Sequence, residues 1–305
     1  DFLAITAYLL SSTIYLYLPL SPDVSMARDR STGWRHTLYK LLALGFRGTE
    51  AEWTRIRKAI NIFAFAIIPV MFSVHTIVSW DFASTKVVGW QSTIFGPYFI
   101  IGAILSGVSA VITILFVLRY TLKNMDYFIR PEHFDALGLL VLIFSMSWAY
   151  FFYNEYLLHW YGGGEVLKQL LTLHASGPSA WVWYLMLACN VGVPWLTLWN
   201  KKLRRTPWAI FIVSILINVG MYAERYTIIP LTLGHQRFPF DWGEYTPRLT
   251  EISIALGTLC LFVLLYLLAS RLIPLIPVWE VQEGQESHRL RKVGKTQVPS
   301  VSELE

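Results

Sequence analysis

The sequence has few charged residues: Asp, Glu, Lys and Arg make up 15% of its 305 residues, whereas hydrophobic residues make up 55%. The mean hydropathy is +0.47. A soluble domain of this length needs far more charged surface, so the composition predicts that the chain is solvated by lipid. Cysteine is scarce as well. Cys189 and Cys260 each lie inside an apolar run, which predicts small core residues and no disulfide framework or cysteine-based metal site.

Other common signals are missing. No glycine-rich phosphate loop is present, because Gly162–Gly164 follow an apolar stretch and do not lead a strand into a helix. No internal repeat is evident. The first apolar run has neither the basic start nor the cleavage site of a signal peptide. Since Asp1 enters this run at once, we expect the chain to lack an N-terminal portion. The net charge of +5 comes from basic residues in loops, so we expect no nucleic acid partner.

Seven apolar stretches are each long enough to span a hydrocarbon core of about 30 Å. They are Phe2–Leu20, Ala59–Trp80, Ser92–Tyr120, Phe134–Tyr161, Ala180–Trp199, Trp208–Ile229 and Leu249–Ile273. The predicted fold class is therefore an all-α integral membrane protein with seven transmembrane helices and no folded domain outside the bilayer. We expect residues 1–280 to form one transmembrane domain, and the polar tail, residues 281–305, to be disordered.

Basic residues alternate between rich and poor loops. The loops after the first, third and fifth stretches and the C-terminal tail are rich in Lys and Arg, and the intervening loops hold one or two each. Positively charged loops stay in the cytoplasm. This pattern places residue 1 on the outer side and the C-terminus in the cytoplasm.

Local patterns refine the helices. Thr49 and Glu52 form a capping box, which predicts that the second helix begins before it enters the membrane. Residues 34–46 mix leucine with basic residues, as in a short helix that lies in the membrane interface. A stripe of small residues on the third stretch predicts close helix packing. The stripe consists of Gly102, Ser106 and Ala110.

Ionisable side chains within membrane helices are costly and are candidates for function. Nearly all of them lie toward the predicted outer side. They are His75, Asp81, Glu155, His159, Glu224, Arg225 and Glu251. Glu155 and His159 are one turn apart and share a helix face. Asn190 and Asn218 fall near mid-depth, and we expect them to form an interhelical hydrogen bond.

His75 and Asp81 form the pair of greatest interest. A histidine that titrates near neutrality and a carboxylate at a membrane interface are typical of a site that takes protons from a quinol. A structural role for both residues is the competing interpretation. Their separation of six residues places them about 120° apart on a continuous helix, so they share a pocket only where the helix ends or bends. A haem between His75 and His159 is disfavoured because His75 lies about a turn and a half deeper.

A long motif runs from Ser73 to Ala83 (SVHTIVSWDFA), and continues as GWQSTIFGPYF at residues 89–99 and GAILSG at residues 102–107. It resembles the NrfD/polysulfide reductase membrane-subunit family, and within it the ActC and ActF subunits of bacterial alternative complex III. The resemblance covers most of the chain and weakens in the tail. Family members of this kind have ten helices, so seven helices with an outside start correspond to a chain without the first three.

The resemblance implies a multi-pass subunit of the bacterial inner membrane that binds menaquinol or ubiquinol and carries no haem or iron–sulfur cluster. It implies three partners: an iron–sulfur subunit, multihaem cytochrome c subunits and a homologous membrane subunit. It also implies quinol-binding or proton-path roles for His75 and Asp81, with Ser79 and Asp1 nearby in the pocket. A non-catalytic anchor or proton-conducting subunit and a secondary transporter remain as alternatives. A transporter predicts midplane ionisable residues and an inverted repeat, neither of which is evident.

Overall fold

The computed structural model describes residues 2–122, 125–235, 243, 245–273 and 278–279, and the backbone of residues 290–293 and 296–299. Among these residues, seven helical stretches are long and apolar enough to cross a membrane. They are Phe2–Asp29, Glu50–Ala83, Phe95–Thr121, Pro131–Gly162, Ala180–Thr197, Pro207–Gly234 and Leu249–Leu272. The prediction of an all-α membrane protein with seven spanning helices is confirmed.

The helices group into two compact units. Unit 1 comprises Phe72–Thr246, and unit 2 comprises Phe2–Met71 with Pro247–Glu305. Helix α3 (Glu50–Ala83) contributes its first part to unit 2 and its last part to unit 1. Among the described residues, the ionisable residues expected at the site fall in unit 1, apart from Glu251.

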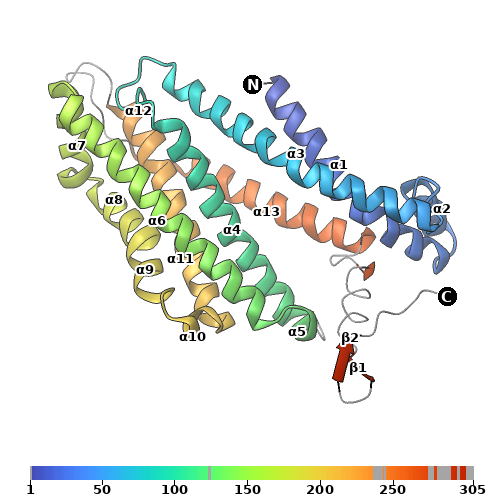
Figure 1. The fold of residues 1–305 in the computed structure, drawn as a ribbon. Coiled ribbons are helices and arrows are strands. Elements are labelled where there is room, and N and C mark those ends of the chain that lie inside the picture. The colour runs from blue at the N-terminus through green and yellow to red at the C-terminus, as the bar shows by residue number, and fades with distance from the viewer. Residues whose placement is uncertain are drawn as a thin grey trace. The chain divides into compact units, whose positions relative to one another are not determined.

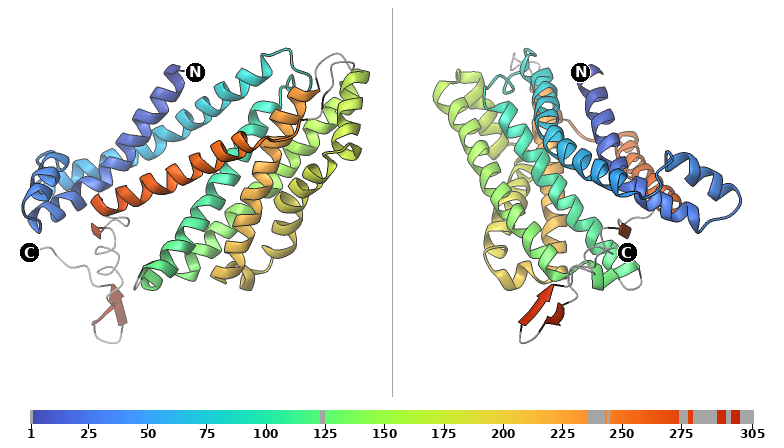
Figure 2. Two further views of the ribbon diagram at one scale, coloured as in Figure 1. Left: turned by 180° about the vertical axis from the view of Figure 1, so that it is seen from behind. Right: turned by 45° about the vertical axis from the view of Figure 1, so that its right-hand side comes forward.

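Unit 1 is a bundle of long helices that run side by side (Figures 1 and 2). Its elements are α4 (Phe95–Thr121), α5 (Met125–Phe128), α6 (Pro131–Gly162), α7 (Glu165–Ser176), α8 (Ala180–Leu187), α9 (Val193–Thr197), α10 (Lys201–Arg204), α11 (Pro207–Tyr226) and α12 (Thr232–Gly234). Helices α7 and α12 lie at one end of this bundle, and α5 and α10 at the other (Figure 1). The short helix α7 was not predicted, because it is too short to span the membrane.

Small residues bring the helices of unit 1 close together. A Cβ atom on Gly102 of α4 would lie 3.0 Å from Met221 Cε on α11, and one on Gly138 of α6 would lie 2.6 Å from Ile210 Cδ1. Trp148 and Phe134 fill the space between the helices and are fully buried. Packing of this kind holds helices together where no hydrophobic force acts between them.

Two helices contain a π-helical turn. η1 (Ala188–Gly192) lies between α8 and α9, and η2 (Thr227–Leu231) follows α11. The prediction of an interhelical hydrogen bond between Asn190 and Asn218 is wrong. Among the described residues, neither side-chain polar atom of Asn190 has a hydrogen-bond partner, and Asn218 Nδ2 donates to the Ser214 carbonyl of its own helix. At the wider turn η1 it is the backbone carbonyl of Asn190 that accepts from Ser145 of α6.

Unit 2 contains α1 (Phe2–Asp29), α2 (Trp34–Leu42), α13 (Leu249–Leu272) and the antiparallel strands β1 (Leu290–Val293) and β2 (Thr296–Pro299). Helix α1 extends beyond the predicted Leu20. The predicted capping box is confirmed, because Glu52 N donates to Thr49 Oγ1 and Thr49 N donates to Glu52 Oε2. Most of the tail that is predicted to be disordered lies outside the described residues.

Candidate functional site

A small cavity lies in unit 1 at the end where α4 begins and α6 ends. Its volume is about 50 Å³. Most of its wall is apolar or aromatic, and its polar groups come from α4, α6, α7 and the segment after α11. The ionisable lining residues are Tyr98, Glu155, Tyr156, His159 and His174. The cavity therefore gathers acid and base groups from helices that are distant in the sequence.

The loop between α3 and α4 closes one side of the cavity. Gly89 has a φ of 96°, a conformation that favours glycine, and a Cβ there would lie 3.1 Å from Leu170 Cδ2. Trp90 Nε1 donates to the Ile228 carbonyl at 2.9 Å. These contacts fix the loop against α7 and η2.

Glu155 is a buried carboxylate with two neighbours. The Ser92 hydroxyl of the α3–α4 loop donates to Glu155 Oε2 and accepts from the Phe95 backbone N–H at 3.1 Å. Glu155 Oε1 lies 3.6 Å from His159 Nε2. The prediction that Glu155 and His159 share one helix face is confirmed.

Tyr156 and His174 form the opposite side. Trp183 Nε1 donates to the Tyr156 hydroxyl at 2.7 Å, and that hydroxyl lies 3.4 Å from His174 Nδ1. Burial, with a smaller contribution from the neighbouring His235 and His159, lowers the pKa of His174 to about 4. The His174 ring is therefore neutral at neutral pH, so one ring nitrogen is a donor and the other an acceptor.

A second polar cluster adjoins this cavity. Trp148 Nε1 donates to Glu224 Oε1 at 2.8 Å, and Glu224 Oε2 lies 3.7 Å from Arg225 Nη2. The Arg225 guanidinium carbon lies 4.0 Å from the centre of the Phe99 ring, which stabilises its charge. Tyr98, which lines the cavity, packs against Trp148 with ring centres 6.0 Å apart.

Both clusters retain unused hydrogen-bonding capacity. Among the described residues, four of their buried side-chain atoms have no hydrogen-bond partner. These atoms are Glu155 Oε1, His174 Nε2, Glu224 Oε2 and Arg225 Nη1. Native proteins rarely leave buried polar atoms unsatisfied, so each one calls for a ligand, a water molecule or an ion.

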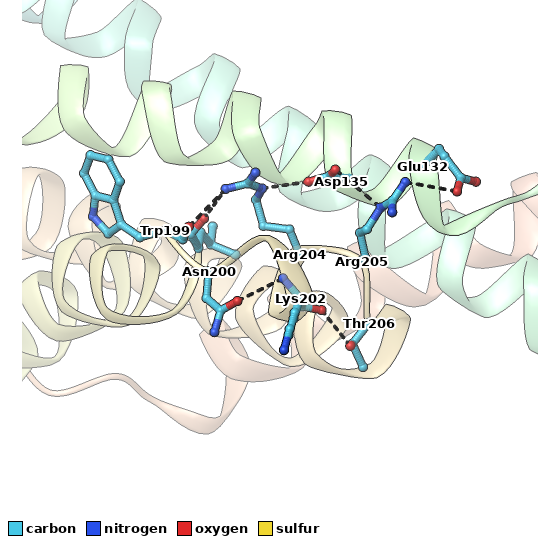
Figure 3. A network of polar contacts seen from close by, with 9 residues as sticks. Glu132, Asp135, Trp199, Asn200, Lys202, Arg204, Arg205 and Thr206 are labelled. Carbon is cyan, nitrogen blue, oxygen red and sulfur yellow. Dashed lines mark hydrogen bonds and ion pairs between the residues drawn. The ribbon is translucent and has the colours of Figure 1, made fainter.

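The other end of the same bundle differs (Figure 3). Arg204 Nε donates to Asp135 Oδ1 at 2.8 Å, and Arg205 lies 3.2 Å from Glu132 and 3.6 Å from Asp135. Asn200 caps α10 by accepting from the Lys202 N–H. These charges are paired with one another, so this end is a structural clasp.

The structure separates His75 from Asp81. Helix α3 continues through both residues to Ala83. They therefore lie about 120° apart, with His75 half-buried and Asp81 exposed. Ser79 is fully buried and donates to the Thr76 carbonyl at 2.7 Å. None of the three lines the cavity. Asp1 lies outside the described residues, and Glu251 caps α13 by accepting from the Arg248 N–H at 2.7 Å.

Sequence reasoning missed Tyr98, Tyr156, His174 and Trp148. Aromatic residues are frequent at helix ends in membrane proteins, so the two tyrosines carried no distinct signal, and Trp148 in the middle of α6 reads as one more apolar core residue. His174 lies on α7, within a loop for which no helix was predicted. The spacing of Glu155, Tyr156 and His159 on one helix was the available signal.

The sequence profile of the family described as polysulphide reductase, NrfD matches residues 1–234. The chain is also similar to the Hdr-like menaquinol oxidoreductase integral membrane subunit of Archaeoglobus fulgidus. The two sequences are 26% identical over 216 residues, which are 65% of this chain and 53% of that relative. The chain thus spans about half the length of the curated relative that it matches. Among the described residues, no three His, Cys, Asp or Glu side chains lie close enough to hold a metal ion.

Proposed function

The chain belongs to the NrfD polysulphide reductase family, and we propose that it is the quinol-binding, proton-handling membrane subunit of a quinol oxidoreductase complex. The similarity to a menaquinol oxidoreductase membrane subunit supports the substrate class. The assembly with an iron–sulfur subunit, multihaem cytochrome c subunits and a second homologous membrane subunit, as in alternative complex III, belongs to the same proposal. So does its location in a bacterial inner membrane with residue 1 outside.

One observation carries the proposal: the charged side chains are paired with one another at one end of unit 1, whereas at the other end they are buried and only partly hydrogen-bonded. At the α10 end, Asp135 and Arg204 are bonded to each other (Figure 3). At the α7 end, Glu155 and Glu224 are buried and each keeps a carboxylate oxygen without a hydrogen-bond partner. Buried ionisable groups with spare capacity in a membrane protein are typical of proton and substrate handling.

The chemistry divides between this chain and its partners. Oxidation of a quinol to a quinone releases two electrons and two protons. The electrons pass to the iron–sulfur subunit, and this chain binds the head group and accepts the protons. We assign head-group binding and deprotonation to His75 and Asp81, with Ser79 and Asp1 as further candidates. Asp81 is exposed and passes protons to water.

The test uses the assembled complex, purified from native membranes through a tag on this chain. We expect iron–sulfur and c-type haem spectra in the preparation and reduction of cytochrome c by added quinol. A quinone analogue that cannot be oxidised should inhibit this turnover and bind with one saturable affinity. A preparation with no quinol-dependent turnover contradicts the proposal. In membranes from cells that lack this chain, unchanged quinol turnover and unchanged binding of the analogue would assign the chain to the non-catalytic anchor role.

A further inference from the structure

The cavity beside Glu155 has the volume of a few water molecules and not of a ring. A water molecule needs about 10–15 Å³, whereas a cavity that binds benzene has about 150 Å³. The observed volume of about 50 Å³ therefore holds about three to five water molecules. A quinone head group, which is larger than benzene, requires a different site.

The polar groups of the wall fit water. A buried water molecule makes two to four hydrogen bonds to groups that are otherwise unsatisfied. Glu155 Oε1 and His174 Nε2 are the unpartnered atoms, and both residues line the cavity. The Tyr156 hydroxyl and the His159 ring add further partners. The two unpartnered atoms come from different helices that both line the cavity, so water inside the cavity is a partner that they can share.

We propose that this cavity is a hydrated proton-accepting site, in which ordered water molecules connect the Glu155 carboxylate with the His174 ring. The role of these waters in quinol oxidation rests on the proposed function. A proton that leaves the quinol hydroxyl moves through the water molecules to Glu155 Oε1 and forms an O–H bond there. The same bond breaks when the proton leaves for the aqueous side. No electron passes through this site.

The α3–α4 loop connects this cavity with the end of α3, where His75 and Asp81 lie. The Phe82 ring of α3 contacts the Trp90 and Phe95 rings, at 5.0 and 6.4 Å between centres, and both rings line the cavity. Ser92 of the same loop donates to Glu155. The end of α3 is therefore linked to Glu155 through the Phe82 ring contacts and Ser92.

The protonation of Glu155 depends on its titratable surroundings. These come from its own helix, from α4, from α7, from α11 and from the residue after α12. They are Tyr156, His159, Tyr98, His174, Glu224, Arg225 and His235. Arg225 is the one fixed positive charge among them, and it lies beside Glu224. Among the described residues, no Lys or Arg forms an ion pair with Glu155, whose one ion-pair neighbour is the titratable His159 ring at 3.6 Å, so no fixed positive charge prevents Glu155 from exchanging a proton.

Two buried methionines offer a direct test for water. Met186 lines the cavity and is 1% exposed, whereas Met221 is 4% exposed and does not line it. Radiolysis of water produces hydroxyl radicals that oxidise methionine sulfur close to where they form. In the assembled complex in lipid nanodiscs, mass spectrometry should show Met186 oxidised several-fold faster than Met221. Equal rates for the two methionines would overturn the proposal.

The proton is tested by infrared difference spectroscopy across a pH titration in H₂O and D₂O. We expect a carboxylic acid band that shifts in D₂O, disappears in Glu155→Gln and remains in Glu132→Gln, an exposed carboxylate at the other end of α6. The Glu155→Gln complex should also oxidise quinol about tenfold or more slowly. A band that survives Glu155→Gln, or parental turnover in that variant, contradicts the proposal. The methionine and infrared measurements need no quinol. They therefore test the hydrated site independently of the proposed quinol-binding function.

Discussion

Asp135 of α6 accepts a 2.8 Å hydrogen bond from Arg204 Nε, and its second carboxylate oxygen lies 3.6 Å from Arg205 Nε. One carboxylate thus fastens α6 to the turn before α11. Its side chain is 17% exposed and that of Arg204 is 13% exposed, so water screens the pair only in part.

Asp135→Asn should therefore lower the free energy of unfolding more than the loss of an exposed ion pair does, since Arg204 keeps its charge and loses its strongest partner. The matched control is Glu132→Gln, whose pair with Arg205 is exposed on both sides and should change stability by about 1 kcal/mol or less. Thermal unfolding of the purified variants in one detergent measures both. Equal shifts for the two variants would show that the clasp is not specific to Asp135.

Gly220→Ala should destabilise unit 1. A Cβ on Gly220 would lie 2.6 Å from Cys189 Cβ and overlap the Asn190 side chain, which belongs to the π-helical turn η1. Overpacking of this kind costs about 1–3 kcal/mol. Gly107→Ala on α4 is the control, because its Cβ meets nothing within 4 Å and alanine favours the helix. If Gly220→Ala unfolds no earlier than Gly107→Ala, α11 and η1 are less tightly packed than described.

The sequence predicted the fold well because lipid imposes a simple rule. Each spanning helix needs a long apolar run, and basic residues mark the loops. The seven spans could therefore be located from the order of apolar and basic residues along the sequence. The Thr49–Glu52 capping box and the Glu155–His159 face were also predicted, since both depend on residues within one helical turn.

The site was predicted only in part because its contacts are not local. Ser92 and Glu155 are 63 residues apart in the sequence, and Trp148 and Glu224 are 76 apart. The spacing of residues along one helix does not indicate which residues of two different segments will be in contact. The helix α7 that carries His174 and the two π-helical turns depend on tertiary packing. The pairing of His75 with Asp81 needed a bend in α3 that the described helix does not have.

The predicted orientation is tested by cysteine labelling in sealed cells, in a variant whose exposed native cysteine is replaced (Cys260→Ala). A membrane-impermeant maleimide should label Gly164→Cys, which lies just before α7 at an exposed position where a Cβ meets nothing within 4 Å, and spare Thr206→Cys, which lies just before α11. Both positions should react once the membrane is opened, which controls for reactivity. Labelling of Thr206→Cys in sealed cells would contradict the predicted orientation and show that this loop lies on the outer side.

Acid should destabilise unit 1 through His174. Its pKa is about 4 in the fold, below its ordinary value of 6.5. Between these values the unfolded chain binds a proton that the fold does not, so stability falls as the pH falls through this range and changes little above it. The loss is on the order of 3 kcal/mol. His174→Gln should flatten this slope, whereas the exposed His36→Gln should not. Parallel stability profiles of His174→Gln and the parent would show that His174 titrates normally.

The proposed roles of Asp81 and His75 are tested in the assembled complex. Asp81→Asn keeps the size of the side chain and removes its basic charge, so it isolates proton transfer from packing. General-base groups contribute about 100- to 10,000-fold in rate, and we expect quinol-dependent cytochrome c reduction to fall by at least about tenfold. His75→Gln should act similarly and shift the pH optimum.

Asp126→Asn is the control for Asp81→Asn, because it makes the same change at an exposed position of α5, at the clasp end of unit 1. It should assemble and turn over as the parent does. Asp81 is exposed, so its substitution should leave the unfolding temperature unchanged. A lower rate of quinol-dependent cytochrome c reduction would then indicate a role of Asp81 in proton transfer and not in stability. Normal assembly together with parental rates from about pH 6 to about pH 9 in both site variants would assign His75 and Asp81 a structural role. Quinol deprotonation would then depend on Glu155 and Glu224, the buried carboxylates that retain an oxygen without a hydrogen-bond partner.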